Sequence, residues 1–99
     1  MDLRELRYIS ALARHGSVTR AAEELGITQP TLSRFLLAAE ERHGVRLFER
    51  IGKRLVITPS GREFVRRSQE ILRLGQQLED RMADLASRDG GHISLAITP

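Results

Sequence analysis

Apolar residues in the first half of the chain recur every three or four positions, which is typical of amphipathic helices. Residues 2–14 carry one such stripe, formed by Leu3, Leu6, Ile9, Leu12 and Ala13. A second stretch follows Ser17, a good N-cap, and ends at Gly26. A third follows Thr28 and ends at Gly44, with Leu32, Phe35, Leu36 and Ala39 on one face. The pattern predicts three helices joined by very short turns.

The pattern changes between residues 46 and 58. Apolar and β-branched residues flank Ile51-Gly52-Lys53, which predicts a short β-hairpin. Thr58 and Pro59 then suit the N-cap and first position of a helix, and a helical pattern continues without a break to about Ser87. The sequence therefore predicts a mainly α fold, a winged helix-turn-helix of three helices plus a hairpin, followed by a long helix.

The last residues of the chain resemble the beginning of a further domain. A Gly-Gly pair is followed by Ile93, Leu95 and Ile97 in strand-like alternation, and a lone strand does not fold by itself. We expect three parts: a winged helix-turn-helix domain at 1–58, a linker or dimerisation helix at 59–87, and at 88–99 a hinge and the first strand of a domain that is absent from this chain.

Composition excludes several classes of protein. The net charge of +3 and pI near 10.5 favour an anionic partner weakly, and fifteen of the sixteen basic residues are Arg, whose planar fork suits phosphate and guanine. There is no cysteine, and the three histidines are scattered without ligand spacing. Neither a signal peptide nor a membrane-spanning run is evident. We therefore expect a cytoplasmic protein that is not an enzyme and holds no metal or cofactor in this segment.

The third helix has an unusual start, because Pro30 lies in its first turn and Arg34 is its only charge between Ile27 and Ala39. Proline loses no hydrogen bond there, and an acid-free helix start approaches phosphates without repulsion. Gln can pair with adenine and Arg with guanine in the major groove. The outward residues are Gln29, Pro30, Ser33 and Arg34. The alternative is an ordinary solvated helix face.

The hairpin adds Arg50, Lys53 and Arg54, with no acid between them. At a wing tip they can reach a minor groove or flanking phosphates. Charge that protects a sheet edge from aggregation is the alternative.

The long helix carries a heptad repeat, which predicts dimerisation through this helix. Its members are Phe64, Ser68, Ile71, Gly75, Leu78, Met82 and Leu85. Packing of the same face under a further domain is the alternative.

The stretches "SVTRAAEELGITQPTLSR" and "LVITPSG" resemble the N-terminal region of LysR-type transcriptional regulators, over about residues 2 to 86. The resemblance implies double-stranded DNA as partner, an interrupted palindrome as site, and a homodimer formed by antiparallel linker helices. It also implies tetramers of the full-length protein and a C-terminal domain that binds a small-molecule effector. The matching recognition-helix positions are Thr28, Gln29, Pro30, Thr31, Ser33 and Arg34, and the wing positions are Arg50, Lys53 and Arg54.

The chain departs from the family pattern after Arg34, where Phe35-Leu36-Leu37 is continuously apolar and Ala39 replaces a larger aliphatic residue. Leu37 lies off the core face, so no DNA contact is assigned beyond Arg34. We expect sequence-specific DNA binding by a bacterial regulator. A winged helix used for protein–protein contact, or a DNA-binding appendage of another protein, are the alternatives.

Overall fold

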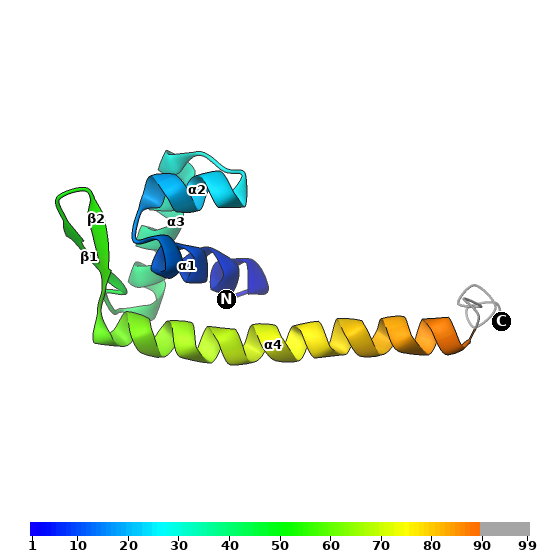
Figure 1. The fold of residues 1–99 in the computed structure, drawn as a ribbon. Coiled ribbons are helices and arrows are strands. Elements are labelled where there is room, and N and C mark those ends of the chain that lie inside the picture. The colour runs from blue at the N-terminus through cyan, green and yellow to red at the C-terminus, as the bar shows by residue number, and fades with distance from the viewer. Residues whose placement is uncertain (90–99) are drawn as a thin grey trace.

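The computed structural model describes residues 1–89 and confirms the mainly α architecture. In chain order the elements are α1 (Leu3–His15), α2 (Val18–Leu25), α3 (Gln29–His43), β1 (Phe48–Ile51), β2 (Arg54–Ile57) and α4 (Pro59–Arg88) (Figure 1). The two strands form an antiparallel hairpin beside α3. From residue 90 onward, the predicted hinge and strand lie outside the described residues.

The helix boundaries follow the capping residues that the sequence predicts. Asp2 is the N-cap of α1 rather than its first residue, and its carboxylate accepts a hydrogen bond from the Glu5 amide at 2.9 Å. Ser17 and Thr28 cap α2 and α3 in the same way. Each of these helices ends at a glycine, as expected.

The core is aliphatic and lies between α1, α2, α3 and the base of the hairpin. Its fully buried side chains include Ile9, Leu12, Leu32 and Leu47. Leu3, which the periodicity places on the core face of α1, is instead exposed. It belongs to the first turn of the helix, at the edge of the arc that Leu6 and Ile9 share, so the core does not reach it.

A buried carboxylate joins α1 to the end of α3. Glu5, expected only as an acid near the helix start, is buried, forms an ion pair with Arg42 and lies at hydrogen-bond distance from His43. The His43 Nε2 atom lies 3.2 Å from the carboxylate. Burying a carboxylate costs free energy unless the charge is paired, so the contacts of Glu5 fix how α3 lies across α1.

The start of α4 is held tightly against the hairpin. Thr58 donates its hydroxyl to the Arg46 carbonyl at 2.6 Å and accepts the Gly61 amide at 2.9 Å. A side chain at Gly61 would place its Cβ 2.1 Å from the Leu47 carbonyl oxygen. The "TPSG" segment is therefore a joint in which only glycine fits at the fourth position.

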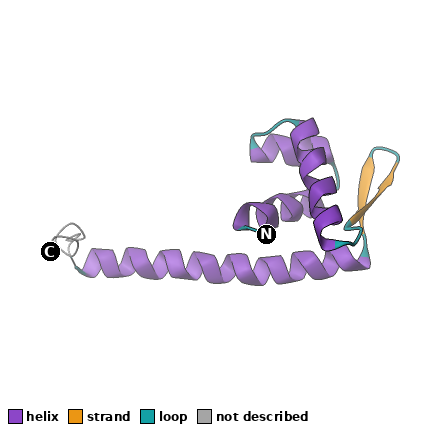
Figure 2. Ribbon diagram, turned by 180° about the vertical axis from the view of Figure 1, so that it is seen from behind, coloured by secondary structure: helices purple, strands orange, loops and turns teal. Residues whose placement is uncertain are grey.

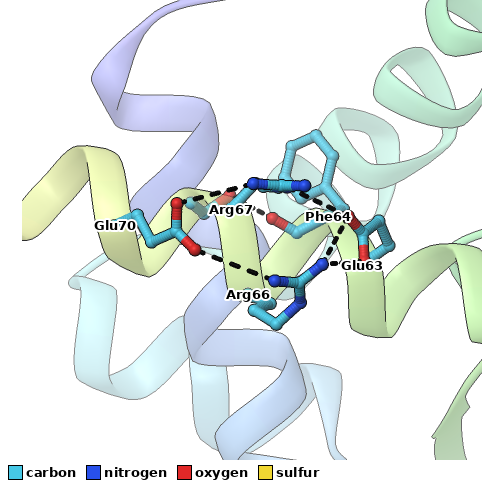
Figure 3. A network of polar contacts seen from close by, with 6 residues as sticks. Glu63, Phe64, Arg66, Arg67 and Glu70 are labelled. Carbon is cyan, nitrogen blue, oxygen red and sulfur yellow. Dashed lines mark hydrogen bonds and ion pairs between the residues drawn. The ribbon is translucent and has the colours of Figure 1, made fainter.

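Beyond this joint α4 first lies along α1 and then extends alone, well past the three-helix unit (Figures 1 and 2). Ion pairs within the helix support it: Glu63 contacts Arg66 and Arg67, and both arginines also face Glu70 (Figure 3). Hydrogen bonds from Arg66 and Arg67 hold the pKa of Glu63 below its ordinary value.

Candidate nucleic-acid interface

The first turn of α3 is exposed and its cap is formed by two threonines. Thr28 Oγ1 accepts the Thr31 amide at 3.3 Å and lies 2.7 Å from Thr31 Oγ1. Pro30 occupies the first turn, as predicted, and this turn contains no acid. Gln29, Pro30 and Thr31 are all exposed. The helix therefore presents its positive end and polar side chains to solvent.

The wing is a tight hairpin whose tip is basic. Arg50 pairs with Leu55 and Ile51 pairs with Arg54, so Gly52 and Lys53 form the turn. Gly52 has a φ of +63°, which suits the first central position of a two-residue hairpin turn. Lys53 and Arg54 are exposed at the tip.

Arg50 differs from the other two wing residues. Its guanidinium donates to Ser33 Oγ at 3.5 Å, so it reaches α3 rather than the outer edge of the wing. Strand alternation explains this, because Arg50 shares a face with the buried Phe48 and Leu55. Ser33 in turn is half-buried rather than fully outward. Arg50 therefore belongs to the junction between α3 and the wing.

Buried hydrogen bonds fix the wing relative to α3. The Glu40 carboxylate, near the end of α3, accepts the amides of Leu47 at 2.7 Å and Phe48 at 3.3 Å. On the other strand, the Leu55 amide donates to the Gly16 carbonyl at 3.0 Å. The wing is thus attached to α3 on one side and to the α1–α2 turn on the other, and its basic tip has a defined position.

Both ribbon views place the wing tip and the first turn of α3 on the side of the molecule away from α4 (Figures 1 and 2). A cleft of about 390 Å³ lies between the wing and the starts of α2 and α3. It is lined by Ser17, Val18, Thr19, Gln29, Arg50 and residues 52–55. Ser17 and Thr19 were not predicted to belong to this surface. The acid-free first turn of α2 is the sequence feature that indicates them.

Among the described residues, the cations on this face have no acid partner, whereas Arg66 and Arg67 on α4 do. Within residues 1–89 no carboxylate lies at ion-pair distance from Arg34, Arg50, Lys53 or Arg54. By contrast, the α4 arginines of Figure 3 are paired with acids of the same helix. Unpaired cations beside an acid-free helix start create a positive surface that suits an anionic polymer.

The predicted dimerisation positions separate into two groups. Phe64 packs against the chain's own core, and Ser68 is only 1% exposed and donates its hydroxyl to the Phe64 carbonyl. These two are committed to this chain because α4 lies against α1 there. Ile71, Leu78 and Met82 are exposed, Leu85 and Gly75 are partly so, and Leu74, which the heptad pattern omitted, is also exposed.

Other kinds of site find no support in the part of the chain that the structure describes. There, no group of three or more His, Cys, Asp or Glu side chains is arranged to hold a metal ion. Among residues 1–89, no helix is both long and apolar enough to cross a bilayer.

Together, three helices, an attached wing and an exposed α3 start define a winged helix-turn-helix domain. Residues 3–62 match the family model described as "Bacterial regulatory helix-turn-helix protein, lysR family". The chain belongs to this family, as its sequence motifs predicted.

Proteins of known role support the assignment. The chain is 39% identical over 97 residues to the RuBisCO operon transcriptional regulator of Allochromatium vinosum, covering 98% of this chain and 32% of that protein. It is 38% identical to the HTH-type transcriptional regulator BudR of Klebsiella aerogenes, covering 99% of this chain and 68% of BudR. The chain thus spans about a third of the first relative's length. These relatives are regulators, which agrees with the prediction that this chain is not an enzyme.

The fold also matches a solved complex. The crystal structure of the BenM_DBD/catB site 1 DNA complex superposes with a TM-score of 0.83 at 37% identity, covering 88% of this chain and 97% of that chain.

Proposed function

We propose that this chain is the sequence-specific DNA-binding region of a bacterial transcription regulator, with α3 in the major groove and the wing at the minor groove. The observation that carries the proposal is that the α3 start and the wing tip lie on one side, where among residues 1–89 no acid pairs with Arg34, Lys53 or Arg54. The solved structure of a related domain bound to DNA supports it.

The exposed side chains of α3 divide into two kinds of contact. Gln29 and Arg34 are suited to adenine and guanine edges, each pair giving about 1–3 kcal/mol of base discrimination. Pro30 and Ser33 lie on the same face. We assign Thr28 and Thr31, at the helix cap, to the DNA backbone. The Thr31 amide is bound by Thr28 and Pro30 has none, so the Gln29 amide is the one that the first turn can offer to a phosphate.

The wing adds binding energy that depends little on sequence. Lys53 and Arg54 extend from the tip towards the minor groove and its phosphates. Arg50 lies between the wing and α3, so we assign it to a phosphate at the edge of the major groove rather than to the minor groove.

A second copy of the chain is the proposed partner of α4. Ile71, Leu78 and Met82 expose an apolar stripe beyond the part that packs on α1. A Cβ atom added at Gly75 would meet nothing within 4 Å among residues 1–89, so packing within the described part of the chain does not require glycine there. A closely approaching partner helix accounts for it. Two such chains, paired antiparallel, would read an interrupted palindrome.

The remaining family expectations are proposals about the whole protein. A small-molecule effector would bind a domain that follows this one, and that domain would contribute to tetramer assembly. The protein would act in the cytoplasm, where its DNA is. None of the residues discussed above is assigned to the effector.

The experiment selects a tight-binding duplex from random-sequence DNA with the wild-type protein and compares it with a scrambled duplex over a range of salt. Arg34→Ala should lose discrimination at one base pair per half-site. Arg54→Ala should weaken binding to both duplexes equally and lower the salt slope by about one. Arg66→Ala is the matched control, because Arg66 lies on α4 and is paired with Glu63; it should bind as the wild type does.

Two results would contradict parts of this proposal. Equal, weak binding of both duplexes by the wild type would contradict the proposal and favour a protein-contact module. If Arg34→Ala instead weakens both duplexes alike and lowers the salt slope, Arg34 binds phosphate rather than a base.

A further inference from the structure

Leu37 continues the face of α3 that carries the proposed DNA contacts, although it is apolar. It follows Ser33 by four residues and Arg34 by three, which places all three on one side of the helix. The core side is formed by Leu32 and Leu36, which are buried. Leu37 is 59% exposed, so the fold of this chain makes little use of it.

The neighbouring residue that also departs from the family pattern has a different role. Phe35 is half-buried, its ring centroid lies 4.8 Å from that of Tyr8, and the Arg4 guanidinium carbon lies 5.5 Å from the centroid of its ring. Phe35 thus packs α3 against α1. Of the two, Leu37 alone is exposed, and no part of residues 1–89 covers it.

Leu37 borders a hollow that holds both acidic and basic side chains. It lines this hollow of about 480 Å³ together with Glu41, Val45, Arg46 and Arg50. Arg50 lies beside Ser33, one turn before Leu37, and Arg34 is unpaired. Glu40 also borders the hollow, but its carboxylate is taken up by two strand amides. Glu41, one turn further on, is the first exposed acid of the helix. Arg46 is paired with Glu40, so the unpaired cations nearest Leu37 among residues 1–89 are Arg34 and Arg50. Cations on both sides of an apolar side chain suit a base edge flanked by phosphates.

We propose that Leu37 is a specificity-determining residue that covers the C5-methyl group of a thymine in the major groove. The inference rests on the proposed function, because it requires α3 to lie in that groove. Thymine is the only base that presents a methyl group there, whereas the other bases present polar atoms. Leucine against those atoms would leave them without a hydrogen-bond partner, which disfavours the other bases.

The test uses a duplex selected from random-sequence DNA by the wild-type protein, in which each thymine is replaced in turn by deoxyuridine. This replacement removes only the methyl group. At one thymine per half-site, it should weaken wild-type binding about fourfold, the contribution expected from burying one methyl group. Leu37→Ala should bind the unmodified duplex more weakly and lose its sensitivity at that thymine alone. Fluorescence anisotropy at one fixed salt concentration measures both.

Leu3→Ala provides the matched control, because Leu3 is also an exposed leucine but lies at the start of α1. It should keep the complete wild-type pattern of thymine sensitivities. Since Leu37 is exposed, Leu37→Ala should keep the wild-type melting temperature, so a loss of binding does not reflect unfolding.

Two outcomes overturn the inference, and they differ from a failure of the proposed function. If Leu37→Ala keeps every thymine sensitivity, another group reads the methyl. If the Leu37→Ala protein binds every duplex as the wild type does, Leu37 lies away from the DNA and contacts a protein instead. A wild type that fails to distinguish the selected from the scrambled duplex would refute the proposed function itself.

Discussion

The two halves of α4 share one heptad pattern but have different surroundings. In the first half, Gly61 and Ser68 are buried against the hairpin base and α1. In the second half, Leu78 and Met82 are 62% and 54% exposed. Apolar or small residues recur at the same spacing in both halves, yet within residues 1–89 only the first half is covered by other elements.

The difference shows what periodicity identifies and what it leaves open. A heptad pattern marks the face of a helix that will be covered, without naming what covers it. Small residues give the further information. Gly61 is required by a carbonyl 2.1 Å from where its Cβ would be, whereas Gly75 has nothing within 4 Å. The first glycine serves this fold, and the second is available to a partner.

The largest expected effect comes from Gly61→Ala. The added methyl group would collide with the Leu47 carbonyl and the Ile57 side chain, so the joint between wing and α4 must shift. We expect a loss of about 3 kcal/mol in the free energy of unfolding, as for severe overpacking. Urea denaturation followed by circular dichroism measures it.

Gly75→Ala is the matched control for this comparison. It places the same methyl group in open space on the same helix, and alanine is favoured over glycine in a helix by about 1 kcal/mol. The free energy of unfolding, measured at concentrations where the protein is monomeric, should therefore rise slightly. Equal destabilisation by both substitutions would contradict the distinction between the two halves.

Leu78→Arg probes the exposed half. Each leucine buried in an interface contributes about 1.5–3 kcal/mol, and a symmetric dimer contains two copies, so the variant should be monomeric by sedimentation velocity. Its binding to a palindromic duplex should weaken sharply. Gln76→Arg, on the opposite side of α4, should remain dimeric. A Leu78→Arg protein that still dimerises would show that the stripe is not the interface.

The smallest effect concerns the three-helix unit against which α4 packs. Hydrogen bonds from Arg14 and His15 hold the pKa of Glu24 at about 2, against an ordinary value of 4.5. A lowered pKa means that the carboxylate stabilises the fold above pH 4.5 and loses this contribution as the pH falls towards 2. Thermal melts between pH 6 and pH 2 should show a smaller loss of Tm for Glu24→Gln than for the wild type. Parallel curves would show that this contact contributes nothing to stability.

Most of the fold could be predicted from the sequence because its signals are local. The caps at Ser17, Thr28 and Thr58 fix the starts of α2, α3 and α4, and the glycines at 16, 26 and 44 fix the ends of α1, α2 and α3. The resemblance to the LysR family, carried by two short motifs, predicted the winged helix-turn-helix that the structure shows.

What the sequence did not reveal depends on contacts between residues far apart in the chain. The buried carboxylate of Glu5, for example, contacts His43, which follows it by 38 residues in the chain. Likewise, the contact between Arg50 and Ser33 follows from how the wing lies on α3, and the burial of Phe64 and Ser68 follows from how α4 lies on α1. The helical wheel places Leu37 off the core face, but its position beside Arg50 depends on how the wing lies on α3.

The position of the DNA is tested most directly by mapping the changes in backbone amide NMR shifts when a selected duplex is added to isotope-labelled protein. We expect the changes to concentrate in residues 17–20, 28–37 and 50–54, on the side away from α4. The amide shifts of residues 74–85, the exposed stripe of α4, should keep the values that they have in the DNA-free dimer. Changes centred on α4 or on the start of α1, with residues 28–37 unaffected, would contradict this position of the DNA.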